Sequence, residues 1–243
     1  MIQNVLCFLE ESAEAYPHKT AFADEHTSLT YRRLSDLSMR IGSVLGQKTG
    51  PRRPVPVLAE KNVFTLTAFM GIVRAGCFYV FLDAGQPAER LNRILDTLQA
   101  DLMIADKESL SLAGPVSFSG EILPLEDLMS LPDDALNPGL LASIRRQSTD
   151  TDPLYGIFTS GSTGVPKGVV ASHRSVIDFI GHFTDLFHIT QDDIIGNQAP
   201  FDFDVSVKDI YSALKTGATL EVIPKKLFSI PTGLLDYLCD RKI

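Results

Sequence analysis

The chain has 243 residues, enough to bury a sizeable core as one large domain or two smaller ones. Its composition, 44% hydrophobic and 21% charged, is that of an ordinary globular protein, and its formal net charge at pH 7 is −8. This acidity excludes a broad nucleic-acid or anionic-membrane surface, because such partners require a basic face. A local basic pocket is still compatible with it.

The cysteines and the apolar segments indicate a soluble, cytoplasmic protein. Cys7, Cys77 and Cys239 are odd in number and form no pair or cluster at metal-binding spacing, so we expect buried free thiols in a reducing compartment. The N-terminal segment lacks the basic start of a signal peptide. The longest apolar run, residues 63–73, is shorter than the roughly 20 residues that span a bilayer.

The first elements in chain order are amphipathic. Apolar spacing predicts a helix over residues 2–15 and a second helix over 34–45. Between them, residues 20–24 and 28–31 predict a short hairpin with polar turn residues.

From residue 55 the pattern alternates between strands and helices. Compact apolar runs predict strands at 55–60, 78–83 and 101–106, separated by two helical patterns. Asn62 is placed to cap the first of these helices, which ends at Gly76, and Pro87 lies in the first turn of the second. Strand–helix alternation of this length is typical of crossover units around a parallel sheet.

The rest of the chain begins with a stretch rich in Pro, Gly, Asp and Ser. We expect residues 107–153 to form an irregular connector with one or two short elements. A strand over 154–160, a polar loop and a helix starting near His173 follow. Further on, a loop leads into a helix that ends at Gly217, then a strand, then a last helix with no strand after it. The pattern predicts an α/β fold of parallel-sheet layers flanked by helices, apparently truncated.

The loop in "YGIFTSGSTGVPKGVV", residues 155–170, has the composition of a phosphate-binding loop. Its glycines allow close backbone approach to a ligand, its hydroxyls donate hydrogen bonds, and Lys167 adds one positive charge behind the stiff Pro166. It is not a Walker A loop, because Pro166 stands where that pattern requires glycine. The alternative is a Ser/Gly linker between two domains. The flanking apolar strand and helix favour phosphate binding.

Longer stretches carry a family resemblance. The loop resembles the signature loop of the adenylate-forming enzymes, the superfamily of acyl-CoA synthetases, luciferases and amino-acid adenylation domains. The segments "LTYRRLSDLSMRIGSVL", "VRAGCFYVFLDAGQPAERLNRILDTLQADLMI" and "FDFDVSVKDIYSALKTGATLEVIP" resemble other parts of that family in family order. The resemblance runs from about residue 8 to the end. It implies the N-terminal part of the family's large domain, without the C-terminal lid domain.

The resemblance implies that a carboxylate attacks the α-phosphate of ATP, giving an acyl adenylate and pyrophosphate, and that the acyl group then passes to a thiol. Positioning and charge stabilisation dominate such a reaction. Lys167 and Thr163 are the implied catalytic residues. The loop residues implied to hold the phosphates are Thr159, Ser160, Gly161, Ser162, Thr163, Gly164 and Lys167. The family also implies Mg²⁺.

Within "FDFDVSV", residues 201–207, the resemblance to the amino-acid-activating branch implies that Asp204 meets the substrate's α-ammonium group. Asp204 could instead only cap the following helix. Phe203 would line the carboxylate side of the pocket, and Val205 and Lys208 its side-chain part. Lys208 hints at an acidic amino acid but could equally point to solvent. The segment also resembles the corresponding one in D-alanine ligases that load carrier proteins, so a small substrate is an alternative.

Several family features are missing from the sequence. These are the Tyr-Gly-Pro-Thr-Glu segment that stacks adenine and supplies a magnesium-binding glutamate, the ribose-binding aspartate and the C-terminal lysine. We therefore expect a fragment of an amino-acid adenylating ligase, working with a phosphopantetheine thiol on a carrier protein and completed by a missing C-terminal half. The alternatives are an acyl- or aryl-CoA ligase, and an inactive partial domain that acts as a binding or assembly module. His173 and Arg174 are expected to serve helix entry and packing.

Overall fold

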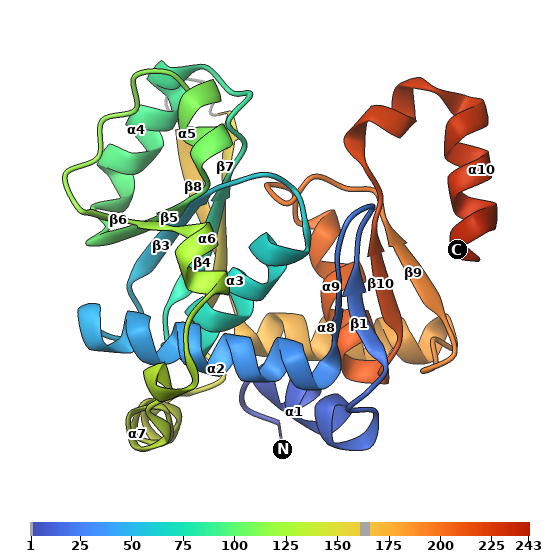
Figure 1. The fold of residues 1–243 in the computed structure, drawn as a ribbon. Helices are drawn as coiled ribbons and strands as arrows, with labels where there is room; N and C mark the ends of the chain where they lie inside the picture. The colour runs from blue at the N-terminus through green and yellow to red at the C-terminus, as the bar shows by residue number, and fades with distance from the viewer. Residues whose placement is uncertain (1, 161–165) are drawn as a thin grey trace. The chain divides into compact units, whose positions relative to one another are not determined.

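The computed structural model describes residues 2–160 and 166–243 and shows an α/β chain (Figure 1). It divides into two compact units. Unit 1 combines the N-terminal residues through Asp36 with Lys61–Val63 and Arg174–Ile243. Unit 2 comprises Leu37–Glu60 and the described residues of Phe64–His173.

The elements lie close to the predicted positions over most of the chain. The α-helices are α1 Leu6–Ala15, α2 Tyr31–Lys48, α3 Val63–Arg74, α4 Ala88–Leu98, α5 Lys107–Leu112, α6 Leu125–Met129, α7 Pro138–Gln147, α8 His173–Leu186, α9 Val205–Thr216 and α10 Pro231–Arg241. The strands are β1 Thr20–Ala23, β2 Ser28–Thr30, β3 Pro54–Leu58, β4 Phe78–Leu82, β5 Leu102–Ala105, β6 Glu121–Pro124, β7 Pro153–Ser160, β8 Pro166–Ser172, β9 Ile194–Asn197 and β10 Thr219–Val222. Short 3-10 turns occupy Asp133–Ala135 and Lys225–Ser229.

Unit 1 is built on a four-stranded sheet with the order β2-β1-β10-β9. β10 runs parallel to both β1 and β9, and only the β1–β2 hairpin is antiparallel. The buried Tyr31 fixes α9 to this sheet, since its hydroxyl lies 2.7 Å from the carbonyl oxygen of Ala213 and 2.6 Å from that of Ala218. Burial raises the pKa of Tyr31 far above its ordinary value, so the hydroxyl stays a donor. Gly217 ends α9 at a φ of 76°, as predicted.

Unit 2 is built on a six-stranded sheet with the order β6-β5-β3-β4-β7-β8. Neighbouring strands are parallel except for β7 and β8. Because side chains alternate along β4, Tyr79 and Phe81 face one side of the sheet and Val80 and Leu82 the other. Phe69 of α3 stacks on Tyr79 with ring centroids 4.1 Å apart. The predicted strand–helix–strand crossovers around a parallel sheet are thus confirmed.

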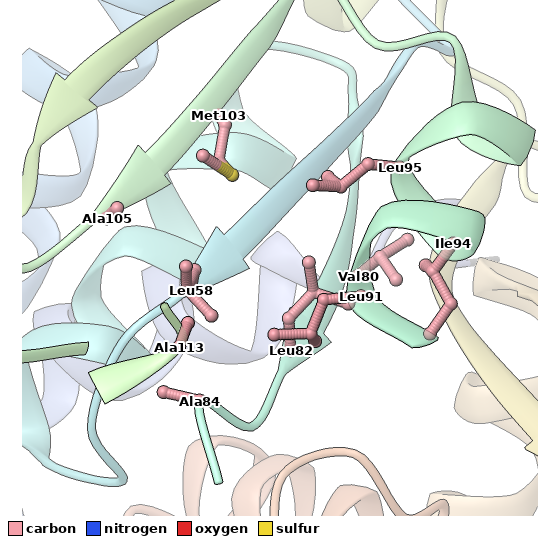
Figure 2. Close-up of a cluster of buried hydrophobic side chains, with 10 residues drawn as sticks. All are labelled: Leu58, Val80, Leu82, Ala84, Leu91, Ile94, Leu95, Met103, Ala105 and Ala113. Carbon is pink, nitrogen blue, oxygen red and sulfur yellow. The ribbon is translucent and has the colours of Figure 1, made fainter. Parts of the chain in front are cut away.

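The other face of this sheet carries the hydrophobic cluster shown in Figure 2. Side chains of α4 pack there against those of β3, β4 and β5. Ala113, the residue directly after α5, belongs to the same cluster. The cluster consists of Leu58, Val80, Leu82, Ala84, Leu91, Ile94, Leu95, Met103, Ala105 and Ala113. This packing fixes α4 against β3, β4 and β5.

The stretch 107–153 is more regular than the sequence suggested. Instead of one or two short elements it contains α5, β6, α6, a 3-10 turn and α7. Polar side chains cap two of these helices: Asp106, just before the stretch, accepts from the amide of Ser109, and Asn137 within it accepts from the amide of Leu140. Pro138 suits the first turn of α7 because its fixed φ is helical and a backbone N–H there would have no partner within the helix.

The second difference concerns the chain after the polar loop. The sequence predicted that the loop leads directly into a helix, but β8 intervenes and pairs antiparallel with β7 along its length. The two valines of β8, Val169 and Val170, are each 53% exposed, so this strand has no apolar alternation to signal it. The helix α8 then begins at His173, as predicted.

Candidate functional site

β7 and β8, the strands on either side of the polar loop in the sequence, form an antiparallel hairpin in unit 2. β7 and β8 pair with Thr159 opposite Lys167 and Ser160 opposite Pro166. Thr159 and Lys167 are exposed, and the hydroxyl of Thr159 donates to the carbonyl oxygen of Lys167 at 3.4 Å. Lys167 therefore stands at the start of the returning strand. The predicted phosphate-binding residues Gly161, Ser162, Thr163 and Gly164 lie outside the described residues.

Arg90 of α4 holds the end of β7. Its guanidinium donates to the carbonyl oxygen of Phe158 at 3.0 Å and to the side chain of Gln86 at 2.8 Å. The ring of Phe158 in turn lies against Gly168 of β8, where an added Cβ would come within 3.1 Å of the ring. Sequence reasoning missed Arg90, because nothing in a helical pattern tells which carbonyl its guanidinium will reach.

The predicted substrate residues lie in unit 1: Phe203 and Asp204 end the connection from β9 to α9, and Val205 and Lys208 belong to the start of α9. Phe203 is 56% exposed, Asp204 is exposed and Val205 is 50% exposed. Turn hydrogen bonds shape this segment: the amide of Phe203 donates to Pro200, and that of Val207 donates to Asp204. The local fold thus presents three consecutive predicted site residues on the surface of unit 1.

Asp204 stands at the N-cap position of α9 but does not act as a side-chain cap. Its backbone is already helical, at φ −60° and ψ −27°, and its carboxylate accepts no capping hydrogen bond within the described part of the chain. Residues that cap through their side chain normally adopt an extended backbone instead. The geometry therefore disfavours the capping interpretation.

Lys208 is engaged within unit 1. Its ammonium donates to the carboxylate of Asp209 and lies 6.0 Å from the centre of the Phe183 ring. Asp209 is buried, and its second oxygen accepts from the side-chain amide of Asn197 at 3.0 Å. The cation that hinted at an acidic substrate is therefore paired with a buried carboxylate.

Lys61 is a further residue that sequence reasoning missed. It precedes α3 in the chain, yet its ammonium donates to the carbonyl oxygens of Asn197 at 2.9 Å and Gln198 at 3.0 Å. Burial lowers its pKa to about 8, while the negative charge of Asp209 acts in the opposite direction. No local sequence signal marks a lysine in a loop as the partner of a distant strand end.

His173 opens α8 and is 4% exposed. Burial lowers its pKa to about 4, although the nearby carboxylate of Asp152 favours the charged form. Its backbone amide donates to the carbonyl oxygen of Asp152 at 3.1 Å. The histidine is therefore a neutral, packed residue, which agrees with the expected role in helix entry.

Metal ligands, membrane-spanning helices and cysteine thiols are the other features that bear on function. Over residues 2–160 and 166–243, no three His, Cys, Asp or Glu side chains gather as a metal-binding group. The helices of the same residues are all too short or too polar to cross a membrane. Of the three cysteines, Cys77 is buried, Cys7 is half-buried and Cys239 is exposed, which corrects the expectation of three buried thiols.

Comparison with known proteins agrees with this arrangement. Residues 9–243 match the family described as AMP-binding enzyme. Surfactin synthase subunit 1 of Bacillus subtilis is 36% identical over 231 residues, covering 94% of this chain and 6% of that protein. A D-alanine--D-alanyl carrier protein ligase of Staphylococcus aureus is 31% identical over 232 residues, covering 95% of this chain and 44% of the ligase. The chain thus spans less than half the length of these relatives.

Solved structures show the same fold. A crystal structure of the nonribosomal peptide synthetase FmoA3 matches with a TM-score of 0.87 and 26% identity, over 99% of this chain and 25% of that one. The N-terminal subdomain of Klebsiella oxytoca NpsA matches with a TM-score of 0.77 and 20% identity, over 92% of this chain and 54% of that one. The family match covers nearly the whole chain and includes both the hairpin and the segment before α9. The chain therefore belongs to the AMP-binding enzyme family, the adenylate-forming ligases.

Proposed function

We propose that the protein of which this chain forms at least part activates an amino acid as its aminoacyl adenylate, with release of pyrophosphate. The observation that carries this proposal is Asp204, an exposed carboxylate that makes no capping bond in the described structure. A carboxylate in that position is available to an ammonium group, and the charge-assisted hydrogen bond is among the strongest a side chain offers. Phe203 and Val205 beside it supply apolar surface.

The same carboxylate discriminates between substrate classes. A fatty or aromatic acid carries no ammonium group, so its binding would remove water from the Asp204 carboxylate without pairing it, at a cost in binding free energy. The relatives support an amino-acid substrate, since one is named for D-alanine and others are peptide synthetases.

The hairpin would hold the phosphates of ATP, which is the second substrate. Lys167 and Thr163 would stabilise the charge that develops as pyrophosphate leaves, and the remaining hydroxyls and glycines of the loop would surround the phosphate oxygens. The family also implies Mg²⁺. Among the described residues, no three His, Cys, Asp or Glu side chains form a group that could hold the ion.

The acceptor belongs to the same proposal. Activated acyl groups in this reaction type pass to a thiol, and we infer a phosphopantetheine thiol on a carrier protein, in keeping with the name of the D-alanyl carrier protein ligase. Further polypeptide, such as a C-terminal half, would add the adenine- and ribose-binding residues that the sequence lacks.

Amino-acid-dependent ATP–pyrophosphate exchange tests the proposal. The chain, and a polypeptide extended beyond Ile243, are assayed with each amino acid and with a panel of fatty and aromatic acids. We expect exchange with one or a few amino acids, and the Asp204→Asn variant should lower kcat/KM for them by about 100-fold, because a charged hydrogen bond is lost.

The matched control is Asp236→Asn, an exposed carboxylate on α10 of the same unit. It should leave exchange unchanged. Exchange driven by a fatty or aromatic acid and insensitive to Asp204→Asn would contradict the proposal in favour of an acyl- or aryl-CoA ligase. A complete absence of exchange from both polypeptides would favour a binding or assembly module.

A further inference from the structure

The ammonium of Lys61 lies where two parallel strands of unit 1 end. Besides the carbonyl oxygens of Asn197 and Gln198, it reaches that of Ile223 at 3.5 Å. Asn197 is the last residue of β9, and Ile223 directly follows β10. One side chain therefore binds the backbone at the carboxyl ends of both neighbouring strands.

These contacts fix the start of the segment that carries the proposed substrate residues. Residues 198–204 connect β9 to α9 and include Phe203 and Asp204. The ring of Phe201, only 3% exposed, lies 5.7 Å from the Lys61 ammonium. The lysine thus holds this connection at its first residues and also contacts its middle.

A buried polar network continues from the same point into α9. The side chain of Asn197 donates to Asp209, whose other oxygen is bound by Lys208. Asn197 therefore binds Lys61 through its backbone and Asp209 through its side chain, which connects the strand end with the helix that follows the segment. Such a network is costly to bury and is weak evidence for stability, but it restricts the geometry of the groups around it.

We propose that Lys61 is a positioning residue for the amino-acid site: by binding the carbonyl oxygens at the end of β9 it fixes the backbone that presents Phe203 and Asp204. It does not contact the substrate itself. The last step, from a fixed segment to substrate binding, rests on the proposed function, whereas the effect on the segment does not.

Hydrogen–deuterium exchange followed by mass spectrometry tests the structural step on the 243-residue chain without a ligand. Peptides covering residues 196–207 report on the segment through the amides of Phe203, Ser206 and Val207, which are held by turn hydrogen bonds. The variants are Lys61→Met, which removes the donor, and Lys61→Arg, which keeps both charge and donors. Lys226→Met is the matched control, since Lys226 pairs with Glu25 on the surface of unit 1.

We expect exchange in the peptides of residues 196–207 to be about tenfold faster in Lys61→Met, because bonds to an ammonium are lost, with little change in β1 and α1. Lys61→Arg should keep most of the protection, and the control should keep all of it. Unchanged exchange in Lys61→Met, or equal losses in the Arg and Met variants, would overturn the role of the ammonium. If Lys61→Met does not fold, Lys61→Gln takes its place in the same measurement. The proposal then requires that Lys61→Gln lose more protection from hydrogen exchange in residues 196–207 than elsewhere in the chain.

The step from a fixed segment to substrate binding is tested by kinetics on the adenylating polypeptide, meaning whichever of the two polypeptides shows ATP–pyrophosphate exchange. Lys61→Met should raise KM for the amino acid by about tenfold and leave KM for ATP within about twofold, with rescue by Lys61→Arg. Suppose that the parent shows amino-acid-dependent ATP–pyrophosphate exchange. Equal increases in KM for the amino acid and KM for ATP would then overturn the positioning role of Lys61. Loss of protection in residues 196–207 without any amino-acid-dependent exchange by the parent would instead uphold the structural step and reject the proposed function.

Discussion

Charged side chains in this protein fall into two groups according to what surrounds them. Asp209 is buried and Lys61 is half-buried, and both form hydrogen bonds with Asn197, so their charges serve the fold of unit 1. Lys167 and Asp204 are exposed on the hairpin and before α9. Charges that the fold does not use are the ones available to a ligand, and this distinction supports the roles proposed for the second group.

Lys167→Ala tests the hairpin at this scale. The substitution removes the positive charge at the start of β8, so the charge on departing pyrophosphate loses a stabilising partner. We expect the rate of ATP–pyrophosphate exchange in the adenylating polypeptide to fall by about two orders of magnitude, measured with saturating amino acid.

Lys107→Ala is the comparison variant, because Lys107 is likewise exposed and lies in unit 2, at the start of α5. Its rate of ATP–pyrophosphate exchange should equal that of the parent. Equal rates for Lys167→Ala and the parent would reject the pyrophosphate role of the hairpin.

His173 predicts how stability depends on pH. Its pKa is about 4 in the folded chain because of burial, against 6.5 for an exposed histidine, so the unfolded chain binds the proton more tightly. The free energy of unfolding should therefore fall as the pH falls from 6.5 towards 4, by about 3 kcal/mol in total from this group. Above pH 6.5 the group contributes no pH dependence.

The measurement is urea unfolding at several pH values on the parent and on His173→Gln. The variant should lose the part of the pH dependence that belongs to His173, so that the difference between the two proteins narrows as the pH falls. His182→Gln, at an exposed position on α8, should behave like the parent. Parallel curves for His173→Gln and the parent would show that the buried imidazole titrates normally.

At the scale of elements, unit 2 depends on a close approach between α2 and α3. A Cβ added to Gly71 would lie 2.3 Å from Cγ2 of Ile41, and one added to Gly42 would lie 2.4 Å from Cβ of Arg74. Both distances are shorter than any carbon–carbon contact, so the two helices can only cross this closely with glycine at these positions. The glycines are a packing requirement of the crossing and cost the helices some intrinsic stability.

Gly71→Ala should therefore destabilise the chain by about 1–3 kcal/mol, because Ile41 and the helix backbone must move apart. Gly181→Ala is a matched control on α8, where an added Cβ meets no atom within 4 Å among the described residues. That variant should gain about 0.5–1 kcal/mol from helix propensity. Urea unfolding followed by circular dichroism measures both, and a stabilised Gly71→Ala would contradict the close crossing.

The hairpin and the helix caps show how far elements could be predicted from the sequence. Helices α1, α2, α3, α4, α8, α9 and α10 were predicted because their apolar residues repeat with helical period over at least ten residues. β8 was missed because its middle residues, 167–170, are all exposed and so show no alternation of buried and exposed side chains. The short helices between residues 107 and 147 were missed because capping residues and loop residues are of the same types.

At the scale of the whole molecule, each unit is assembled from separated parts of the chain. In unit 1, Phe22 of β1 pairs with Leu220 of β10, so the first and last thirds of the sequence share one sheet. Lys61–Val63 belongs to the same unit although the residues on both sides of it belong to unit 2. No periodicity in the sequence reports such pairings, because hydrogen bonds between distant strands depend on backbone groups that every residue shares.

The sequence by itself determined the α/β class, most elements, the family and the residues proposed for phosphate and substrate, because these depend on short-range periodicity and on motifs of fixed spacing. Only the tertiary structure decided that Asp204 does not cap α9, that Lys208 is bound by Asp209, and that Lys61 and Arg90 hold the ends of distant strands. The physical reason is that a side chain's hydrogen-bond partner and burial are set by what folding brings next to it, and residues far apart in the chain leave no mark on each other's local pattern.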